Sequence, residues 1–325
     1  MYLHDAFVAF LGKINPNEKD VDVAKKAHED VRAYLASDEG LRAKYVNSYV
    51  AGSYQRQTAI SPVKDVDVVC LTTYTKADQP TAVLNELRRV LAKKYELDNT
   101  VTNRRSILVK IEGTHLTMDI IPAIPTGGTK DQIWVPDRGL QAWIRSHPYG
   151  HIELATKRNQ ESAEIGDRRQ YLSVVKMMRW FRHEQLETRR HPKGFIVEVL
   201  CLELAPTNAK EWAEAVRATM DSIGATYGLH RIRKTAPELD DPALPGEKIR
   251  TQMGAADFAT LLDEVDGARA TLKAAIDSED NTEAAKLYRK VFGDAFPVGD
   301  GSGGKGAAAV FARSERNVRS SPTFA

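Results

Sequence analysis

Aspartates inside otherwise apolar strand segments are the feature that most constrains this chain. Residues 66–71 read Val-Asp-Val-Val-Cys-Leu, a run typical of a buried strand. Because side chains alternate along a strand, Asp65 and Asp67 point to the same face, where two ionised carboxylates repel each other unless a cation lies between them. Residues 115–121 have a second strand pattern, which Asp119 interrupts. If the two strands pair, three carboxylates converge on one site.

Three converging carboxylates predict a site for divalent metal ions. An oxygen-only ligand set suits Mg²⁺ or Mn²⁺, which proteins bind through a few carboxylates together with substrate phosphates and water. Two such ions can clamp an in-line displacement. We therefore predict two Mg²⁺ (or Mn²⁺) ions held by Asp65, Asp67 and Asp119, and we expect the same three residues to carry the catalysis.

A Gly-Ser turn upstream predicts an anion site. Residues 46–50 have strand character and lead into Gly52-Ser53, after which residues 54–58 are expected to open a helix. A strand, a small-residue turn and a helix N-terminus present exposed N–H groups to an anion, here a triphosphate. Alone, a Gly-Ser pair is usually a turn and an Asp-x-Asp a solvated strand end. Their order and spacing in one chain favour the functional interpretation.

These residues resemble a known family. The motif Gly-Ser-Tyr-x-Arg-x-Thr from Gly52, the Asp65 and Asp67 pair and the later Asp119 are similar to the polymerase-beta-like nucleotidyltransferase superfamily. More narrowly, they resemble the bacterial CD-NTases related to oligoadenylate synthases. The resemblance covers roughly residues 1–297, because later landmarks of the family also have counterparts here, in residues 143–148, 175–180 and 290–297.

The resemblance implies an α+β fold. Its parts would be a polymerase-beta-like nucleotidyltransferase core, in which helices flank a mixed sheet, and a C-terminal helical bundle. We expect the core with its N-terminal helices at residues 1–165, a helical domain that closes the nucleotide cleft at 166–297, and a flexible Gly-rich tail at 298–325. Helical spacing of apolar residues agrees with the second part, at residues 170–187, 195–205, 209–225, 255–278 and 281–292.

The resemblance also implies which residues bind the nucleotide. Ser53 would donate to the β and γ phosphates, and Gly52 would allow that approach without a side-chain clash. Lys176 corresponds to a family lysine that neutralises triphosphate charge from the helical domain, whereas its spacing alone is that of a surface lysine. Lys193 is followed by Gly194 where the family often has a serine, so one phosphate contact lacks its usual residue.

The motifs leave three functional hypotheses. The resemblance implies a metal-dependent enzyme that condenses NTPs into a cyclic di- or trinucleotide second messenger with release of pyrophosphate, in bacterial antiphage (CBASS) signalling where a downstream effector binds the product. The alternative is template-independent nucleotidyl transfer to RNA or protein, which demands an extended acceptor surface. A third is a catalytically silent nucleotide-binding module. Intact Asp65, Asp67 and Asp119 argue against the third hypothesis, because developing charge in the transition state needs metal charge held in place.

The composition of the chain indicates which broad classes of protein it can belong to. The chain has 325 residues, 42% of them hydrophobic, and 46 basic against 44 acidic residues leave a net charge of +2, so it is no polycation built to grip long nucleic acid. Local pairs such as Arg104-Arg105 are interpreted as solvated. Cys70 and Cys201 lack metal-ligand spacing and are predicted to be buried packing residues in a reducing compartment. No apolar run is long enough for a membrane span, so we expect a cytoplasmic protein without membrane contact.

Partners follow from the same interpretation. NTPs are the expected substrates, and the lack of a zinc-finger spacing argues against DNA sensing. The loop at residues 237–246 lies near the nucleotide cleft in the relatives, and we expect its acidic residues to be solvated. Ala325 resembles the C-terminal residue through which some relatives are joined to other molecules by a ubiquitin-transfer-like enzyme. That likeness predicts a conjugating or regulatory partner at the tail.

Overall fold

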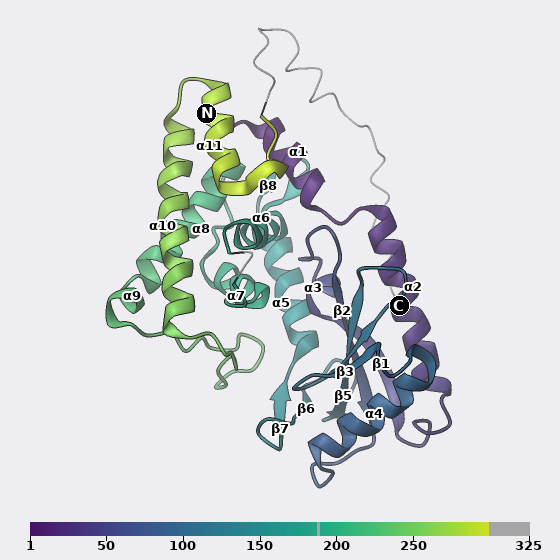
Figure 1. The fold of residues 1–325 in the computed structure, drawn as a ribbon. Coiled ribbons are helices and arrows are strands. Elements are labelled where there is room, and N and C mark those ends of the chain that lie inside the picture. Colours follow the sequence, from purple (N-terminus) through teal and green to yellow (C-terminus); the bar gives the residue numbers. More distant parts are fainter. Residues whose placement is uncertain (187–188, 299–325) are drawn as a thin grey trace.

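The computed structural model describes residues 1–186 and 189–298. The described chain has two parts, a sheet with its covering helices and a larger group of helices, and Figure 1 shows the second above the first. The tail expected at 298–325, with the partner expected at Ala325, lies outside the described residues from residue 299 onward.

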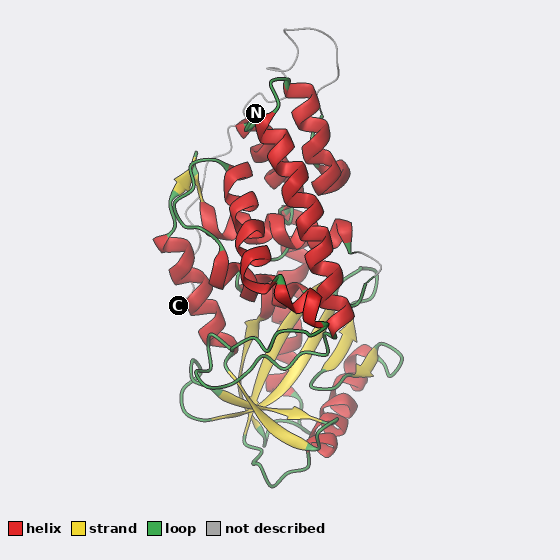
Figure 2. Ribbon diagram, turned by 90° about the vertical axis from the view of Figure 1, so that its left-hand side faces the viewer, coloured by secondary structure: helices red, strands yellow, loops and turns green. Residues whose placement is uncertain are grey.

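Within the described residues, a seven-stranded mixed sheet forms the first part (Figure 2). Five strands follow the order β1-β2-β5-β4-β3, and β6 pairs with the end of β5 and with β7. The central neighbours β2 and β5 are parallel, and the other pairs of this sheet are antiparallel. The bounds are β1 Tyr45–Ala51, β2 Asp65–Thr72, β3 Thr100–Thr102, β4 Ile107–Lys110, β5 Thr117–Pro125, β6 Ile133–Asp137 and β7 Ala142–Ser146.

Helices α2 (Glu18–Ser37) and α4 (Pro80–Tyr95) cover one face of the sheet (Figure 1). Asn17 begins α2, because its side chain accepts a hydrogen bond from the Asp20 N–H. Pro80 begins α4 with the fixed φ that a first helical turn needs. Apolar side chains of both helices pack with every second residue of β2, β4 and β5 in one buried cluster. The residues between them therefore point to the opposite face of the sheet.

The second part is a helical group with one continuous apolar core. Its core includes the fully buried Trp212, Tyr288 and Phe292. Helix α1 packs in this core rather than on the sheet, although the expected boundary at residue 165 assigns it to the first part. The domain boundaries therefore stay a prediction. The bounds are α1 His4–Ile14, α5 Pro148–Glu161, α6 Gln170–Gln185, α7 Gly194–Leu204, α8 Trp212–Tyr227, α9 Leu229–Arg233, α10 Ala255–Asp277 and α11 Asn281–Phe292.

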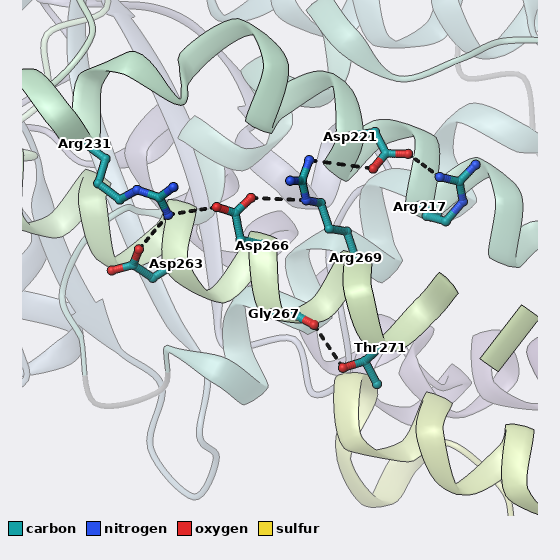
Figure 3. Close-up of polar contacts among 8 residues, drawn as sticks. All are labelled: Arg217, Asp221, Arg231, Asp263, Asp266, Gly267, Arg269 and Thr271. Atoms are coloured by element: carbon teal, nitrogen blue, oxygen red, sulfur yellow. Dashed lines mark hydrogen bonds and ion pairs between the residues drawn. The ribbon is translucent and has the colours of Figure 1, made fainter. Parts of the chain in front are cut away.

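A ladder of ion pairs ties α8, α9 and α10 together (Figure 3). Arg231 of α9 contacts Asp263 and Asp266 of α10, at 2.8 Å each. The ladder continues from Asp266 over Arg269, Asp221 and Arg217. Single exposed pairs stabilise little, whereas a shared network fixes the geometry of several side chains at once. The ladder thus fixes the short helix α9, from which the chain returns toward the sheet as the segment 234–254 (Figure 1).

The structure confirms the predicted α+β fold class and its mixed sheet. The five expected helices after residue 170 are present, with ends shifted by no more than three residues. Cys70 and Cys201 are buried and free, as the sequence predicts. Helix α5 is an element that the sequence pattern does not predict. It buries only Gly150 and Ala155, so it lacks the apolar periodicity of an amphipathic helix.

Candidate active site

The parallel pairing of β2 with β5 brings the three predicted carboxylates together. In this register Asp67 lies opposite Asp119, and Asp65 lies opposite Thr117. Val66 is buried under the covering helices, so strand alternation turns Asp65 and Asp67 to the other face. The strand pairing assumed from the sequence is therefore present, and the carboxylates gather near the beginning of both strands.

Burial and crowded negative charge raise the pKa of Asp67 to about 7. Burial of the carboxyl is the largest cause, repulsion from Asp65 and Asp119 adds to it, and the nearby Arg56 acts in the opposite direction. A carboxyl group in this state marks a place where the fold gathers more negative charge than it neutralises. A bound cation would remove that excess.

The donor set fits Mg²⁺ or Mn²⁺. The candidate ligands are carboxylate oxygens, which these hard cations prefer. Within residues 1–186 and 189–298, no group of three or more His, Cys, Asp or Glu side chains is arranged to hold a metal ion by itself. Mg²⁺ usually binds through one or two carboxylates plus substrate phosphates and water, so a site that the substrate completes agrees with both observations. The identity and number of the ions stay predictions.

The chain turns sharply at Gly52, directly after β1. Gly52 has a φ of 69°, and a Cβ added to it would lie 1.7 Å from Oδ2 of Asp67. Only a glycine adopts this left-handed conformation without strain and leaves room for the carboxylate. The close approach that the structure shows is thus to Asp67, while the approach to a phosphate stays a prediction.

Helix α3 (Gly52–Gln55) is a single turn, shorter than the helix expected at residues 54–58. It ends because Gln57 adopts a left-handed conformation with a φ of 59°. The Ser53 carbonyl accepts hydrogen bonds from the N–H groups of Thr58 (2.9 Å) and Ala59 (3.1 Å). One turn contributes only a small dipole. The Ser53 hydroxyl, which bonds to no other described residue, is therefore the main donor that this turn offers to an anion.

A buried ion network joins this turn to the helical part. Glu198 of α7 accepts hydrogen bonds from Arg56 Nε (2.9 Å) and Nη2 (3.2 Å), from Thr58 Oγ1 (2.8 Å) and from Arg179 Nη1 (2.6 Å). Burial alone would raise the pKa of Glu198, but the charges of Arg56 and Arg179 outweigh it and hold the pKa below its usual value. The turn that carries Ser53 is therefore fixed to α6 and α7 through one carboxylate.

A cavity of about 160 Å³ lies where the turn faces the helical part. Ser53 and Asp65 line it from the sheet, and Arg179, Arg182 and Gly194 line it from the helices. It therefore combines a hydroxyl donor, a candidate metal ligand and two guanidinium groups. That combination suits a chain of phosphates.

A second cavity of about 410 Å³ lies on the other side of Gly52 and Asp67. Its remaining walls include Phe195 of α7, Ile121 of the sheet and residues of the segment 234–254. The volume falls within the range of sites for small molecules, and a mixed apolar and polar lining is typical of them. The two cavities flank the carboxylates.

Comparisons with known proteins agree with this geometry. Residues 1–159 match the family described as Second Messenger Oligonucleotide or Dinucleotide Synthetase domain. A cyclic AMP-AMP-AMP synthase of Acinetobacter sp. is 28% identical over 305 residues, which span 91% of this chain and 86% of that protein. A cyclic AMP-AMP-GMP synthase of Enterobacter hormaechei is 22% identical over 365 residues, which span 94% of each.

Solved structures show the same fold. The CD-NTase CdnG of Bradyrhizobium diazoefficiens, in complex with GTP, has a TM-score of 0.74 at 16% identity over 90% of this chain and 95% of that one. CdnC of E. coli MS115-1, in the CdnC:HORMA-deltaN complex, has a TM-score of 0.73 at 17% identity over 91% and 99%. The chain is therefore similar in sequence to cyclic oligonucleotide synthases and shares the fold of the CD-NTases.

Lys176 lines neither of the two cavities. Its Nζ donates to Oδ1 of Asn15 (2.8 Å), and burial together with the charges of Arg168 and Arg179 lowers its pKa to about 8. Arg179 lies about one turn further along α6 and does line the smaller cavity with Ser53. Residues three apart share one side of a helix, so spacing in the sequence could not decide which of the two lines the cavity. The role predicted for Lys176 stays a prediction.

The loop at residues 237–246 differs in part from its prediction. Glu238 and Asp240 are exposed, as expected, and Asp240 pairs with Lys248 (2.7 Å). Asp241 is half-buried, lines the larger cavity and contacts Nε2 of His151 at 3.1 Å. Burial alone would raise the pKa of Asp241, but the hydrogen bond and charge of His151, together with the backbone N–H groups of Ala243 and Leu244, outweigh it and lower the pKa. The expectation of solvated acids is therefore wrong for Asp241, which fixes this wall of the cavity to α5.

The described residues contain no helix of the length and apolarity that a membrane crossing requires.

Proposed function

We propose that this protein condenses nucleoside triphosphates into a cyclic di- or trinucleotide with release of pyrophosphate. The observation that carries the proposal is the parallel pairing that sets Asp67 opposite Asp119, next to Asp65 and the Ser53 turn. Relatives that span most of the chain are named as synthases of cyclic trinucleotides, which supports nucleotidyl transfer with this class of product. Transfer to RNA or protein is not favoured by these relatives.

Two Mg²⁺ or Mn²⁺ ions at Asp65, Asp67 and Asp119 belong to the proposal. Bound metal would neutralise phosphate charge and lower the pKa of the attacking ribose hydroxyl. The protein contributes the fixed positions of the carboxylates, since Asp67 and Asp119 belong to hydrogen-bonded neighbouring strands. The raised pKa of Asp67 supports a cation at this place.

The two cavities receive different parts of the substrates in this proposal. The Ser53 hydroxyl donates to the triphosphate in the smaller cavity, and Arg179 and Arg182 neutralise its charge from α6. The larger cavity, beside Phe195, holds a nucleoside so that its hydroxyl lies in line with the donor α-phosphate. Arg179 takes the phosphate role predicted for Lys176, because Arg179 lines the smaller cavity and Lys176 does not.

Partners and setting follow from the family. We propose that the product is a second messenger for a downstream effector in bacterial antiphage (CBASS) defence, in the cytoplasm where nucleoside triphosphates are available. A regulatory partner is proposed as well, because one similar structure is a complex of CdnC with HORMA-deltaN. Co-purification of the native chain from its host with a second protein that raises its synthesis rate would support that partner.

The activity is tested with purified protein, four labelled NTPs and Mg²⁺ or Mn²⁺, followed by phosphatase treatment and chromatography. The proposal expects a phosphatase-resistant product that disappears in the Asp65→Asn/Asp67→Asn variant. Label that appears in added RNA or in protein, instead of in a small cyclic product, would refute it. Adding a host extract to an inactive preparation separates an enzyme that awaits an activator from one without this activity.

A further inference from the structure

The turn between β3 and β4 lies directly against Asp119. β4 pairs with β5, with Leu108 opposite Asp119, so the residues just before β4 reach the start of the catalytic strand. The turn spans residues 103–106, and the N–H of Asn103 closes it by donating to the Ser106 carbonyl (2.9 Å). Its first and last residues, Asn103 and Ser106, are therefore held side by side next to a candidate metal ligand.

Both side chains donate to the same oxygen of Asp119. Nδ2 of Asn103 lies 3.0 Å from Oδ1 of Asp119, and Oγ of Ser106 lies 2.5 Å from it. Oδ2 of Asp119 accepts no hydrogen bond from any other residue that the structure describes. Two donors on one oxygen stop rotation of the carboxylate about its Cβ–Cγ bond and leave the second oxygen unoccupied.

The turn itself is anchored from behind. Its two central residues, Arg104 and Arg105, donate through Nε to the two oxygens of the fully buried Asp137, at 2.6 and 3.0 Å. The N–H of Arg138 donates to the Arg104 carbonyl (3.0 Å). Because Asp137 is the last residue of β6, these hydrogen bonds fix the turn to the end of that strand. The arginine pair predicted to be solvated is thus half-exposed and serves as an anchor.

We propose that Asn103 and Ser106 are positioning residues that orient Asp119 toward its metal ion. The inference rests on the proposed function, in which Asp119 is a metal ligand. Hydrogen bonds to the far side of a ligating group fix the direction of its lone pairs, and their loss typically weakens metal binding about 10- to 100-fold. The geometry serves that purpose, because both donors occupy Oδ1 and so present Oδ2 to the site.

A purely structural role for the turn predicts something different. In that case loss of the two donors would lower the stability of the β3–β4 hairpin and leave the metal affinity of the folded protein unchanged. Ser106 is only 7% exposed, so stability must be measured alongside affinity. Metal affinity in the folded protein therefore separates the two roles, because it does not depend on product formation.

The experiment measures Mn²⁺ binding by electron paramagnetic resonance, in the presence of a non-hydrolysable ATP analogue. The variants are Ser106→Ala, Asn103→Ala, their combination, Asp119→Asn, and the combination in the Asp119→Asn background. Thr114→Ala is the matched control, because it removes a hydroxyl that bonds to the backbone in the turn at the other end of β4. Thermal unfolding of each variant is measured beside binding.

The proposal expects the combined variant to bind Mn²⁺ at least about 10-fold more weakly than the original chain. In the Asp119→Asn background, removal of the two donors should cause no further loss, since they act only through Asp119. The single variants should show smaller losses and carry the test if the combined variant does not fold. Unchanged affinity, or losses that add to that of Asp119→Asn, would overturn the inference. An Asp119→Asn variant with the original affinity would instead overturn the proposed metal site itself.

Discussion

Removal of the Glu198 carboxylate tests whether the buried ion network holds the turn that carries Ser53 against helices α6 and α7. Glu198 is 6% exposed and accepts four hydrogen bonds, two from Arg56 and one each from Thr58 and Arg179. Glu198→Ala would leave the guanidinium groups of Arg56 and Arg179 without their carboxylate partner, although Arg179 also donates to Oγ1 of Thr58 (3.3 Å). Arg56 is the more deeply buried of the two, with 10% of its side chain exposed against 15% for Arg179.

The expected cost follows from breaking a buried ion pair by removing one partner. Such a change costs about 3–5 kcal/mol, because the remaining charge stays buried and uncompensated. Arg179 can turn its guanidinium into the neighbouring cavity, which lowers its share of the penalty, whereas Arg56 has less room. A free energy of unfolding of about 5–15 kcal/mol is usual for a protein, so the change would remove a large fraction of it.

The pH dependence has a defined sign. The folded-state pKa of Glu198 lies below its ordinary value of 4.5, so its contribution to stability is fully present above about pH 4.5. That contribution is lost as the pH falls through the lower, folded-state pKa. Urea unfolding at pH 7 is therefore the appropriate assay, and the gap between the original chain and the variant should narrow only in acid.

The control for this prediction is Glu203→Ala on the same helix. Glu203 is exposed and accepts one hydrogen bond, from the Tyr227 hydroxyl (2.7 Å), so its loss should cost no more than about 1.5 kcal/mol. Product formation should fall more in Glu198→Ala than in the control, because Arg56 and Thr58 belong to the segment that carries Ser53. A cost for Glu198→Ala equal to that of the control would refute the reasoning.

Three further predictions concern single groups of the site. Gly52→Ala should abolish product formation, because its Cβ would lie 1.7 Å from the Asp67 carboxylate. The control Gly113→Ala has a similar φ of 70° but open space around the Cβ, so it should lose only about 1–2 kcal/mol of stability from backbone strain, measured by thermal unfolding. Metal-free protein should lose stability as the pH rises from about 4 to about 7, because only the folded state keeps Asp67 protonated in this range. Mg²⁺ should therefore raise the Tm more at about pH 8 than at about pH 5.5, and Asp67→Asn should remove that difference. In kinetics, Arg182→Met should raise the KM for NTP about 10-fold or more, while Lys176→Met leaves it unchanged; the opposite pattern would restore Lys176 as the phosphate residue.

The acidic centre could be predicted from the sequence because its geometry is local. Strand alternation alone turns Asp65 and Asp67 to one face, and two apolar segments of similar length are suited to pair. The structure adds that the pairing is parallel and that Asp119 lies directly opposite Asp67. Gly52 is a similar case, since a glycine before a serine marks a sharp turn. Its closest neighbour, however, is a carboxylate from another strand, and such a contact leaves no local signal.

The supporting residues could not be predicted, because each depends on contacts between distant segments. Glu198 meets Arg56 across 142 residues of sequence. Asp241 meets His151 on a helix whose sequence lacks a strong apolar period. Lys176 and Arg179 lie three residues apart on α6, and only the packing of the helix determines that Arg179, and not Lys176, lines the smaller cavity. Turns and charged pairs therefore gain their roles from the tertiary structure.

The charges left over after these contacts explain what the cleft can bind. Arg56 and Arg179 share the single carboxylate of Glu198, which balances one of their two positive charges. Arg182 donates only to the neutral carbonyls of Pro192 (2.8 Å) and Arg189 (2.6 Å), so its positive charge at the smaller cavity has no acidic partner among the described residues. On the sheet, the three carboxylates lie close together, and repulsion from Asp65 and Asp119 adds to the effect of burial in raising the pKa of Asp67. A simple anion would be repelled by the sheet and a simple cation by the helices. A metal–triphosphate complex carries both signs in a fixed order, with the cation toward the carboxylates and the phosphates toward Arg182, and it is the substrate that this separation of charge favours.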